Sequence, residues 1–420
     1  MPVPPSRTEP PASRARPLIP GWLAFIAVAL VAVNLRPGAS SVGPVLAELE
    51  AGLGMPPPVT GLLTALPTLC FALVGTVAVV LARRVGTNTT IFAAVAAIAV
   101  GLIARPLIDS VPLFLALSVV AFAGMALGNI LVPAFIKQQG GARVAMLTTV
   151  YTTGIGLGSA LPILVGGLIV AGVGWRFTIE LWGLVAASAL VPWLLVLVVG
   201  RRGRATVAVD ASAPAPLPAS AAIVRSPKAV ALAIFFGVQS TQAYVQFGWL
   251  PQIYRDAGLS TENAALSTAI LAGFGILGGL VMSPLVARAG RMWPYVIAMG
   301  LLLVAGYLGI LFAPLAAPWL WSSLLGLSGF AFPTALALIT ARSRHPRTTA
   351  RLSGFTQSVG YLLATAGPLG VGVLRDATGS WALPVWILLG LAGVLTASGL
   401  VAARPGFVDD ELHSRVRRRD

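Results

Sequence analysis

Long apolar runs separated by short polar breaks fill the chain from residue 19 to residue 403. Several of these runs exceed the ~20 residues that a helix needs to cross a bilayer. In lipid such a run must be helical, because its backbone groups find no water with which to bond. The pattern predicts an all-α integral membrane protein with twelve transmembrane helices, at 19–47, 58–82, 88–108, 111–136, 144–171, 175–199, 229–254, 263–287, 292–313, 317–341, 349–374 and 380–403.

The longest break, residues 200–228, divides the spans into two sets of six. It is rich in Ala, Pro and Ser and carries several arginines, which is typical of a flexible linker. Short matches recur in the same order in the two sets, such as LARRVG at 81–86 and VARAGR at 286–291. Such repeats indicate an internal duplication. We therefore expect two six-helix pseudo-repeats, with these boundaries: a tail at 1–18, a first bundle at 19–199, the linker, a second bundle at 229–403 and a tail at 404–420.

The composition supports a membrane protein rather than a large soluble one. Of the 420 residues 57% are hydrophobic and 10% are charged, against about 25% charged in soluble domains, and the mean hydropathy is +0.89. The N-terminal cations and the first apolar run resemble a signal peptide, but no A-x-A-like cleavage site follows, so we expect an uncleaved first span. The single cysteine, Cys70, excludes a disulfide framework or a thiolate metal site.

The net charge of +15 is unevenly distributed along the chain. If both termini are cytoplasmic, all but five of the 28 lysines and arginines lie in cytoplasmic segments; the exceptions are Arg36, Arg105, Arg176, Arg255 and Arg375. This is the bias of the positive-inside rule. It predicts a multi-pass protein of the inner (plasma) membrane with cytoplasmic N- and C-termini, and it explains the charge without a nucleic-acid partner.

Arg36, in the stretch VNLRPGASSVGP at 33–44, is the main candidate for chemistry. A charged side chain within a membrane is costly and usually faces a cavity or a partner. We expect the first span to continue past Asn34, to kink at Pro37 and to place Arg36 in its outer half. There the guanidinium could bind an anion in a cavity, since it is a planar donor of paired hydrogen bonds. The alternatives are a structural ion pair, or an anchor at the outer interface if the span ends at Asn34.

Polar residues in the other central spans are the remaining candidates for a binding site. Gln239, Gln242 and Gln246 recur on one helix face, and an amide stripe within a membrane must face protein or water. Each such residue could instead make a structural hydrogen bond between helices. The predicted substrate-binding set, besides Arg36, is Asn34, Asn129, Tyr151, Gln242, Tyr244, Gln246, Gln357 and Tyr361.

Acidic residues are scarce in the spans. Glu180 lies past the start of one, four residues from Arg176, so a local ion pair is the simpler interpretation and a proton site the alternative. No histidine–carboxylate cluster, nucleotide-binding loop or pair of carboxylates suggests catalysis. We expect neither an enzyme nor a bound metal or cofactor.

Six plus six helices with a long basic linker resemble the major facilitator superfamily. Within it, NLRP and SVGP in the first span, QFGWLPQIYRDAG at 246–258 and SGFTQSVGYLLATAGPLGVGVLRDATGSW at 353–381 are similar to the cyanate/nitroimidazole transporter (CynX/NimT) family. The superfamily's loop between spans two and three resembles G-x-x-x-D-R-x-G-R-R, whereas GTVAVVLARRVG at 75–86 lacks the aspartate.

The resemblance implies a secondary transporter that works by alternating access, with a small anion or a small polar or aromatic solute as substrate. It also implies a monomer in the lipid bilayer, with a small-molecule substrate as partner. The alternative is a multidrug exporter of amphipathic compounds, which predicts a broad apolar pocket and weak dependence on Arg36.

Overall fold

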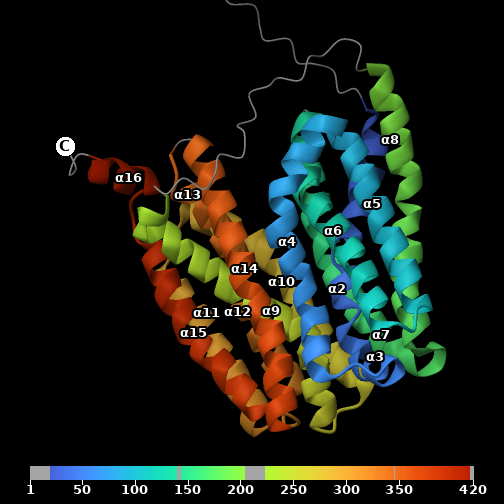
Figure 1. Cartoon of the computed structure of the whole chain (residues 1–420). Helices are drawn as coiled ribbons and strands as arrows, with labels where there is room; N and C mark the ends of the chain where they lie inside the picture. The colour runs from blue at the N-terminus through green and yellow to red at the C-terminus, as the bar shows by residue number, and fades with distance from the viewer. Residues whose placement is uncertain (1–18, 140–142, 204–222, 345, 417–420) are drawn as a thin grey trace, which may run out of the picture.

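The computed structural model describes residues 19–139, 143–203, 223–344 and 346–416 (Figure 1). Its regular structure within these ranges is entirely helical. The helices and 3₁₀ turns (η) run in the order α1 Gly21–Val33, α2 Pro37–Ser40, η1 Gly43–Val45, α3 Leu46–Leu53, α4 Pro57–Val85, α5 Thr87–Ala104, η2 Arg105–Leu107, α6 Val111–Gln139, α7 Val144–Ser188, α8 Leu190–Gly203, η4 Ile223–Arg225, α9 Pro227–Asp256, α10 Thr261–Arg288, α11 Trp293–Phe312, α12 Pro318–Ser328, α13 Ala331–Ala341, α14 Pro346–Thr378, α15 Ala382–Ala403 and α16 Val408–Val416.

Ten helical segments of the described chain are long and apolar enough to cross a bilayer, in line with the predicted all-α membrane fold. One of them, Met146–Gly200, has 55 residues, and α7 within it turns sharply at Gly174, where φ is +77°. A side chain is disfavoured in this left-handed region, which explains the glycine. Helix α9 is not among the ten, because it carries several buried polar residues, including Gln239 and Gln242.

The first span is broken rather than kinked. Helix α1 ends at Val33, and α2 begins at Pro37, after a turn formed by Asn34 to Arg36. Proline lacks a backbone N–H and disfavours helical geometry in the residue before it. The expected small-residue helix after Pro37 is instead a series of short pieces, α2, η1 and α3. The break exposes backbone carbonyls that need new partners.

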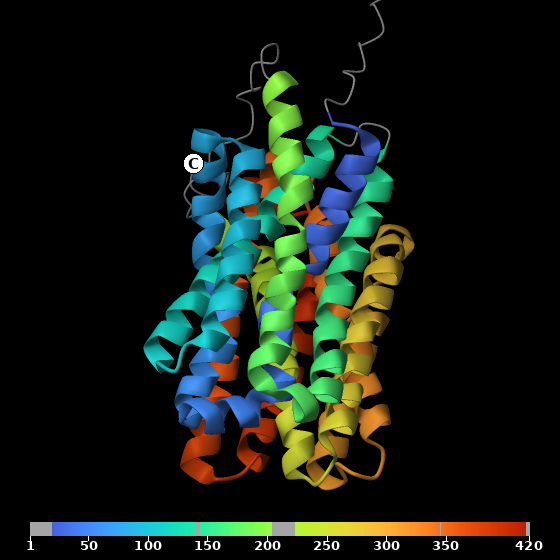
Figure 2. The ribbon, with the colours of Figure 1, turned by 90° about the vertical axis from the view of Figure 1, so that its right-hand side faces the viewer.

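Two segments of the chain, the first half (19–203) and the second half (223–416), lie side by side in Figure 1. They meet mainly through two helix pairs, α4 with α14 and α7 with α10. Figure 2 shows the second pair, with α10 in gold beside α7 in green. We call the upper end of Figure 1, where α16 lies, the α16 end, and the opposite end the α3 end.

Helix α16 forms within the segment predicted only as a tail. Glu411 binds the start of α9, accepting hydrogen bonds from the Ser226 hydroxyl at 2.5 Å and the Lys228 ammonium at 3.1 Å. Asp409 binds the start of α14, accepting from the Arg344 N–H and the Thr348 hydroxyl. Most of the predicted linker, residues 204–222, and the predicted tail at 1–18 fall outside the described residues.

Candidate functional site

A cavity of about 1470 Å³ lies between the two halves. It extends from Arg36 toward the α16 end, where Ile223, Arg351 and Ser353 contribute to its wall. Its lining comes from both halves: α2, α4, α6 and α7 of the first, and α9, α10, α12, α13 and α14 of the second. Seven of the nine predicted binding residues line it, namely Arg36, Asn129, Tyr151, Tyr244, Gln246, Gln357 and Tyr361.

Arg36 reaches this cavity from the break in the first span. Its Nη1 donates a hydrogen bond to the Tyr244 hydroxyl of α9 at 3.2 Å, and its guanidinium carbon lies 5.4 Å from the centre of the Phe71 ring. A cation over a ring face is attracted by the negative charge of that face. Because Phe71 belongs to the first half and Tyr244 to the second, the guanidinium contacts both halves.

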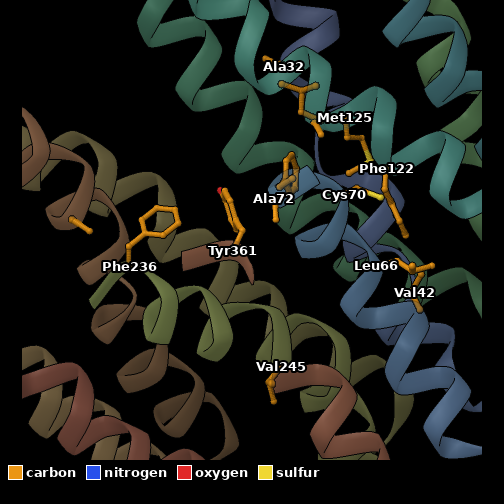
Figure 3. Close-up of a cluster of buried hydrophobic side chains, with 14 of the residues drawn as sticks. Ala32, Val42, Leu66, Cys70, Ala72, Phe122, Met125, Phe236, Val245 and Tyr361 are labelled. Atoms are coloured by element: carbon orange, nitrogen blue, oxygen red, sulfur yellow. The ribbon is translucent and has the colours of Figure 1, made fainter. Parts of the chain in front are cut away.

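Aromatic rings surround the guanidinium. Tyr361 of α14 stacks on Phe71 with ring centres 5.3 Å apart, and it packs edge-on against Phe236 at 5.0 Å. Figure 3 shows Tyr361 beside Phe236, across from Ala72 of α4. The Tyr151 hydroxyl, on α7, donates to the Asn129 side-chain oxygen at 3.1 Å. This part of the cavity has flat apolar faces with hydroxyl groups at their edges.

Gln246 and Gln357 line the cavity and also bind neighbouring side chains. The Gln246 amide donates to the Tyr307 hydroxyl at 3.1 Å, and the Gln357 amide donates to the Ser353 hydroxyl at 2.8 Å. Gln239 and Ser240, which were not in the predicted set, also line the cavity. The Gln239 Oε1 and Ser240 Oγ atoms are buried without a hydrogen-bond partner.

Asn34 and Gln242 do not line the cavity. The Asn34 amide donates to the carbonyl oxygen of Leu30 at 2.8 Å, which stabilises the end of α1. Gln242 is fully buried; its amide donates to the Leu388 carbonyl at 2.9 Å, and its oxygen accepts from Tyr307. Both side chains make the structural hydrogen bonds that polar residues form between or along membrane helices.

Glu180 also lies away from the cavity lining. The expected pair between Glu180 and Arg176 does not form; Arg176 binds Asp109 instead, at 2.5 Å. Since α7 turns at Gly174, Arg176 lies in the first turn after the bend, where it donates to the Pro106 carbonyl in η2 and to Asp109 just after η2.

The sequence did not predict a role for Arg105. It is fully buried and donates to the Gly38 carbonyl at 3.0 Å and to the Ser118 hydroxyl at 3.3 Å. The rings of Phe114 and Phe122 lie 5.6 and 5.8 Å from its guanidinium carbon. Gly38 belongs to the broken first span, so Arg105 supplies a donor to a carbonyl near the break. The sequence signal is an arginine followed by a proline within a span, as at Arg36.

The α3 end is closed where the halves touch. Arg255 of α9 donates to Glu48 of α3 in a bidentate pair, with distances of 3.0 and 2.9 Å. Nearby, α4 crosses α14 so closely that a β-carbon on Gly61 would lie 3.0 Å from the Leu369 carbonyl oxygen. With this end closed and the cavity reaching toward the other, a solute would reach Arg36 from the α16 end.

The broken first span, the paired halves and the central cavity agree with a family assignment from sequence. The sequence model described as Major Facilitator Superfamily matches residues 22–368. The chain belongs to the Major Facilitator Superfamily. Proteins of this superfamily are membrane transporters, and this member is a multi-pass protein of the inner membrane.

Two similar proteins come from Escherichia coli (strain K12). The chain is 32% identical to a 2-nitroimidazole transporter, over 90% of this chain and 94% of that protein. It is 27% identical to the cyanate transport protein CynX, over 87% and 94% respectively. Both similarities confirm the resemblance to the cyanate/nitroimidazole family. Among solved structures, the nucleoside transporter NupG has the same fold, with a TM-score of 0.72 at 11% identity, covering 91% of this chain and 99% of that one.

The charges at the cavity of this superfamily member are of one sign. Arg36 lines its inner part and Arg351 its α16 end, whereas no aspartate, glutamate or histidine lines it among the described residues. The described residues contain no group of three or more His, Cys, Asp or Glu side chains that could hold a metal ion. The lining therefore offers cationic and hydroxyl donors and aromatic faces.

Proposed function

We propose that this protein is a secondary transporter that carries a small anion, or a small polar aromatic solute, by alternating access. The observation that carries the proposal is Arg36, which lies between the two halves in a cavity without a lining acid among the described residues. A guanidinium held among tyrosines suits a planar anion, since it offers paired donors while the rings offer apolar faces. The names of the nitroimidazole and cyanate relatives are consistent with such substrates.

The proposed membrane topology has twelve spans in two six-helix bundles. Ten candidate segments become twelve when Met146–Gly200 is divided at Gly174 and α9 is added. The duplication then relates the second span to the eighth and the fifth to the eleventh. On this numbering the α4–α14 and α7–α10 contacts are equivalent, as expected for a pseudo-two-fold axis.

In the proposed orientation the α16 end is cytoplasmic. Arg255, near the end of α9, binds Glu48 of α3, whereas Lys228 at the start of α9 and Arg344 just before α14 bind Glu411 and Asp410 of α16. The positive-inside rule then places the α16 end in the cytoplasm. In this conformation the substrate would enter the cavity from the cytoplasm. We further infer that the protein works as a monomer.

The test is thermal stabilisation of the purified protein by an anion and its neutral counterpart. A ligand that binds the folded state raises its melting temperature in a concentration-dependent way. For an anionic substrate we expect cyanate or benzenesulfonate to stabilise the wild type but not Arg36→Gln, and neutral benzenesulfonamide to stabilise neither. For a neutral polar aromatic substrate we expect benzenesulfonamide to stabilise the wild type and to lose this effect in Arg36→Gln. The matched control is Arg288→Gln, an exposed cation outside the cavity, which should bind like the wild type.

Equal stabilisation of wild type and Arg36→Gln by the neutral compound would favour the second candidate, an exporter of amphipathic compounds. The size of the cavity supports this candidate, since about 1470 Å³ exceeds the roughly 300–1,000 Å³ of ordinary ligand pockets. In that case Arg36 would have a structural role, and broad binding of uncharged drugs would accompany the result.

A further inference from the structure

No acidic side chain among the described residues pairs with Arg36. Its neighbours are the Tyr244 hydroxyl, the Phe71 ring and the Tyr361 and Tyr151 side chains, all of them neutral. The other cation at the cavity, Arg351, is exposed at the α16 end. Hydroxyls and ring faces solvate a guanidinium but do not neutralise it.

Alternating access requires the α16 end to close over this cation. In the present conformation the cavity extends from Arg36 to that end, so water can compensate the charge. When the halves close there, water is excluded and the guanidinium is left in a medium of low dielectric constant. Removing the partner of a buried charge is strongly unfavourable. A bound anion would remove this cost, because it supplies the missing opposite charge.

Arg105 is a useful contrast. In the part of the chain that the structure describes it too is buried without an acidic partner, but its partners Gly38, Ser118, Phe114 and Phe122 all belong to the first half. Its surroundings therefore stay the same when the halves move relative to one another. Arg36 differs because Tyr244 and Tyr361 belong to the second half, so its surroundings change during the transport cycle.

We propose that the protein is an obligate anion exchanger: the halves reorient only when an anion is bound to Arg36, so each anion leaving one side is replaced by one entering from the other. The inference rests on the proposed anion transport. The exchange involves no bond-making step and no proton carried by the protein. The empty carrier should return more slowly than the loaded carrier by roughly 100-fold or more, the factor that corresponds to an unpaired buried charge.

The experiment measures efflux of radiolabelled benzenesulfonate from proteoliposomes, since this permanent anion cannot leak as a neutral acid. The outside medium contains gluconate, either alone or with unlabelled benzenesulfonate, and potassium with valinomycin holds the membrane potential at zero. We expect efflux to be roughly 100-fold or more faster when benzenesulfonate is present outside. Protein-free liposomes give the leak to be subtracted.

A second variant supplies the missing charge within the protein. Asn129→Asp adds a carboxylate to the lining with little change in shape, next to Tyr151. We expect its efflux into gluconate alone to rise toward the exchange rate. Asn263→Asp, the same change at an exposed position on α10, is the matched control and should leave the wild-type ratio unchanged.

The outcomes distinguish failure of obligate exchange from failure of the proposed anion site. Equal efflux with and without external benzenesulfonate, in a protein that binds it through Arg36, overturns obligate exchange and leaves the proposed function intact. If benzenesulfonate does not raise the melting temperature in an Arg36-dependent way, the proposed anion site is wrong. The exchange proposal, which depends on that site, is then wrong too. An Asn129→Asp variant that still binds benzenesulfonate yet keeps the wild-type ratio contradicts the role of the missing counter-charge.

Discussion

The ion pair between Glu48 and Arg255 provides a direct test of what holds the α3 end closed. Its two distances are 3.0 and 2.9 Å, and its side chains are 31% and 21% exposed. Exposed pairs contribute about 0.2–1 kcal/mol, whereas breaking a fully buried pair costs about 3–5 kcal/mol. For a bidentate pair between these limits we expect a coupling of about 1–2 kcal/mol, which changes the ratio of closed to open molecules roughly 5- to 30-fold.

Distances between spin labels measure this ratio directly. Labels at Ala51→Cys and Asn263→Cys, in a Cys70→Ser background, place one probe on each half at the α3 end. Glu48→Gln and Arg255→Gln should each increase the long-distance population. The double variant should do no more than either single change, because the two side chains act as one pair.

The matched control is Asp109→Asn, which breaks the pair with Arg176. That pair also lies toward the α3 end but joins two segments of the first half. It should leave the distance populations unchanged. Additive effects of Glu48→Gln and Arg255→Gln would refute the argument that the Glu48–Arg255 pair holds the halves together. An equal shift from Asp109→Asn would refute it as well.

Three further predictions concern the residues around the site. Arg105→Gln should lower the free energy of unfolding by about 1–3 kcal/mol and weaken anion stabilisation, because the buried Gly38 carbonyl loses its donor; unfolding curves and the anion melting shift measure this. Gly61→Val should favour the open α3 end in the same spin-label assay, because its side chain would meet the α14 backbone, whereas Gly370→Val has open space and is the control. Burial raises the pKa of Glu411, but hydrogen bonds from Ser226 and Lys228 outweigh it, so the pKa is held below its ordinary value. The stabilisation by Glu411 should therefore be complete above pH ~4.3 and be lost as the pH falls through the lowered pKa, measured as the melting-temperature difference from Glu411→Gln.

Sequence periodicity predicted the helices well and the orientation of their polar residues less well. The stripe of three glutamines on α9 is an example: at 100° per residue, Gln242 lies about 60° to one side of Gln239. That rotation is enough to direct Gln242 toward Leu388 while Gln239 and Gln246 line the cavity. Which side of an amide stripe faces the cavity depends on neighbouring helices that a single chain segment does not specify.

The first span shows a second limit. Arg36 and Pro37 predicted a disturbance, and the structure places one there. The sequence could not show that the break would turn Asn34 back onto α1, because this depends on where the chain goes afterwards. Nor could it show that Arg105, 67 residues further on, would bind the Gly38 carbonyl. Contacts across such separations follow from the packing of whole helices.

Helix α16 has a consequence for how the molecule can be handled. Its contacts with Ser226, Lys228, Arg344 and Thr348 all lie within the second half. A fluorophore or fused domain attached after α16 would therefore be anchored to the second half. We expect such a probe to record motion of the second half relative to the first without joining the two.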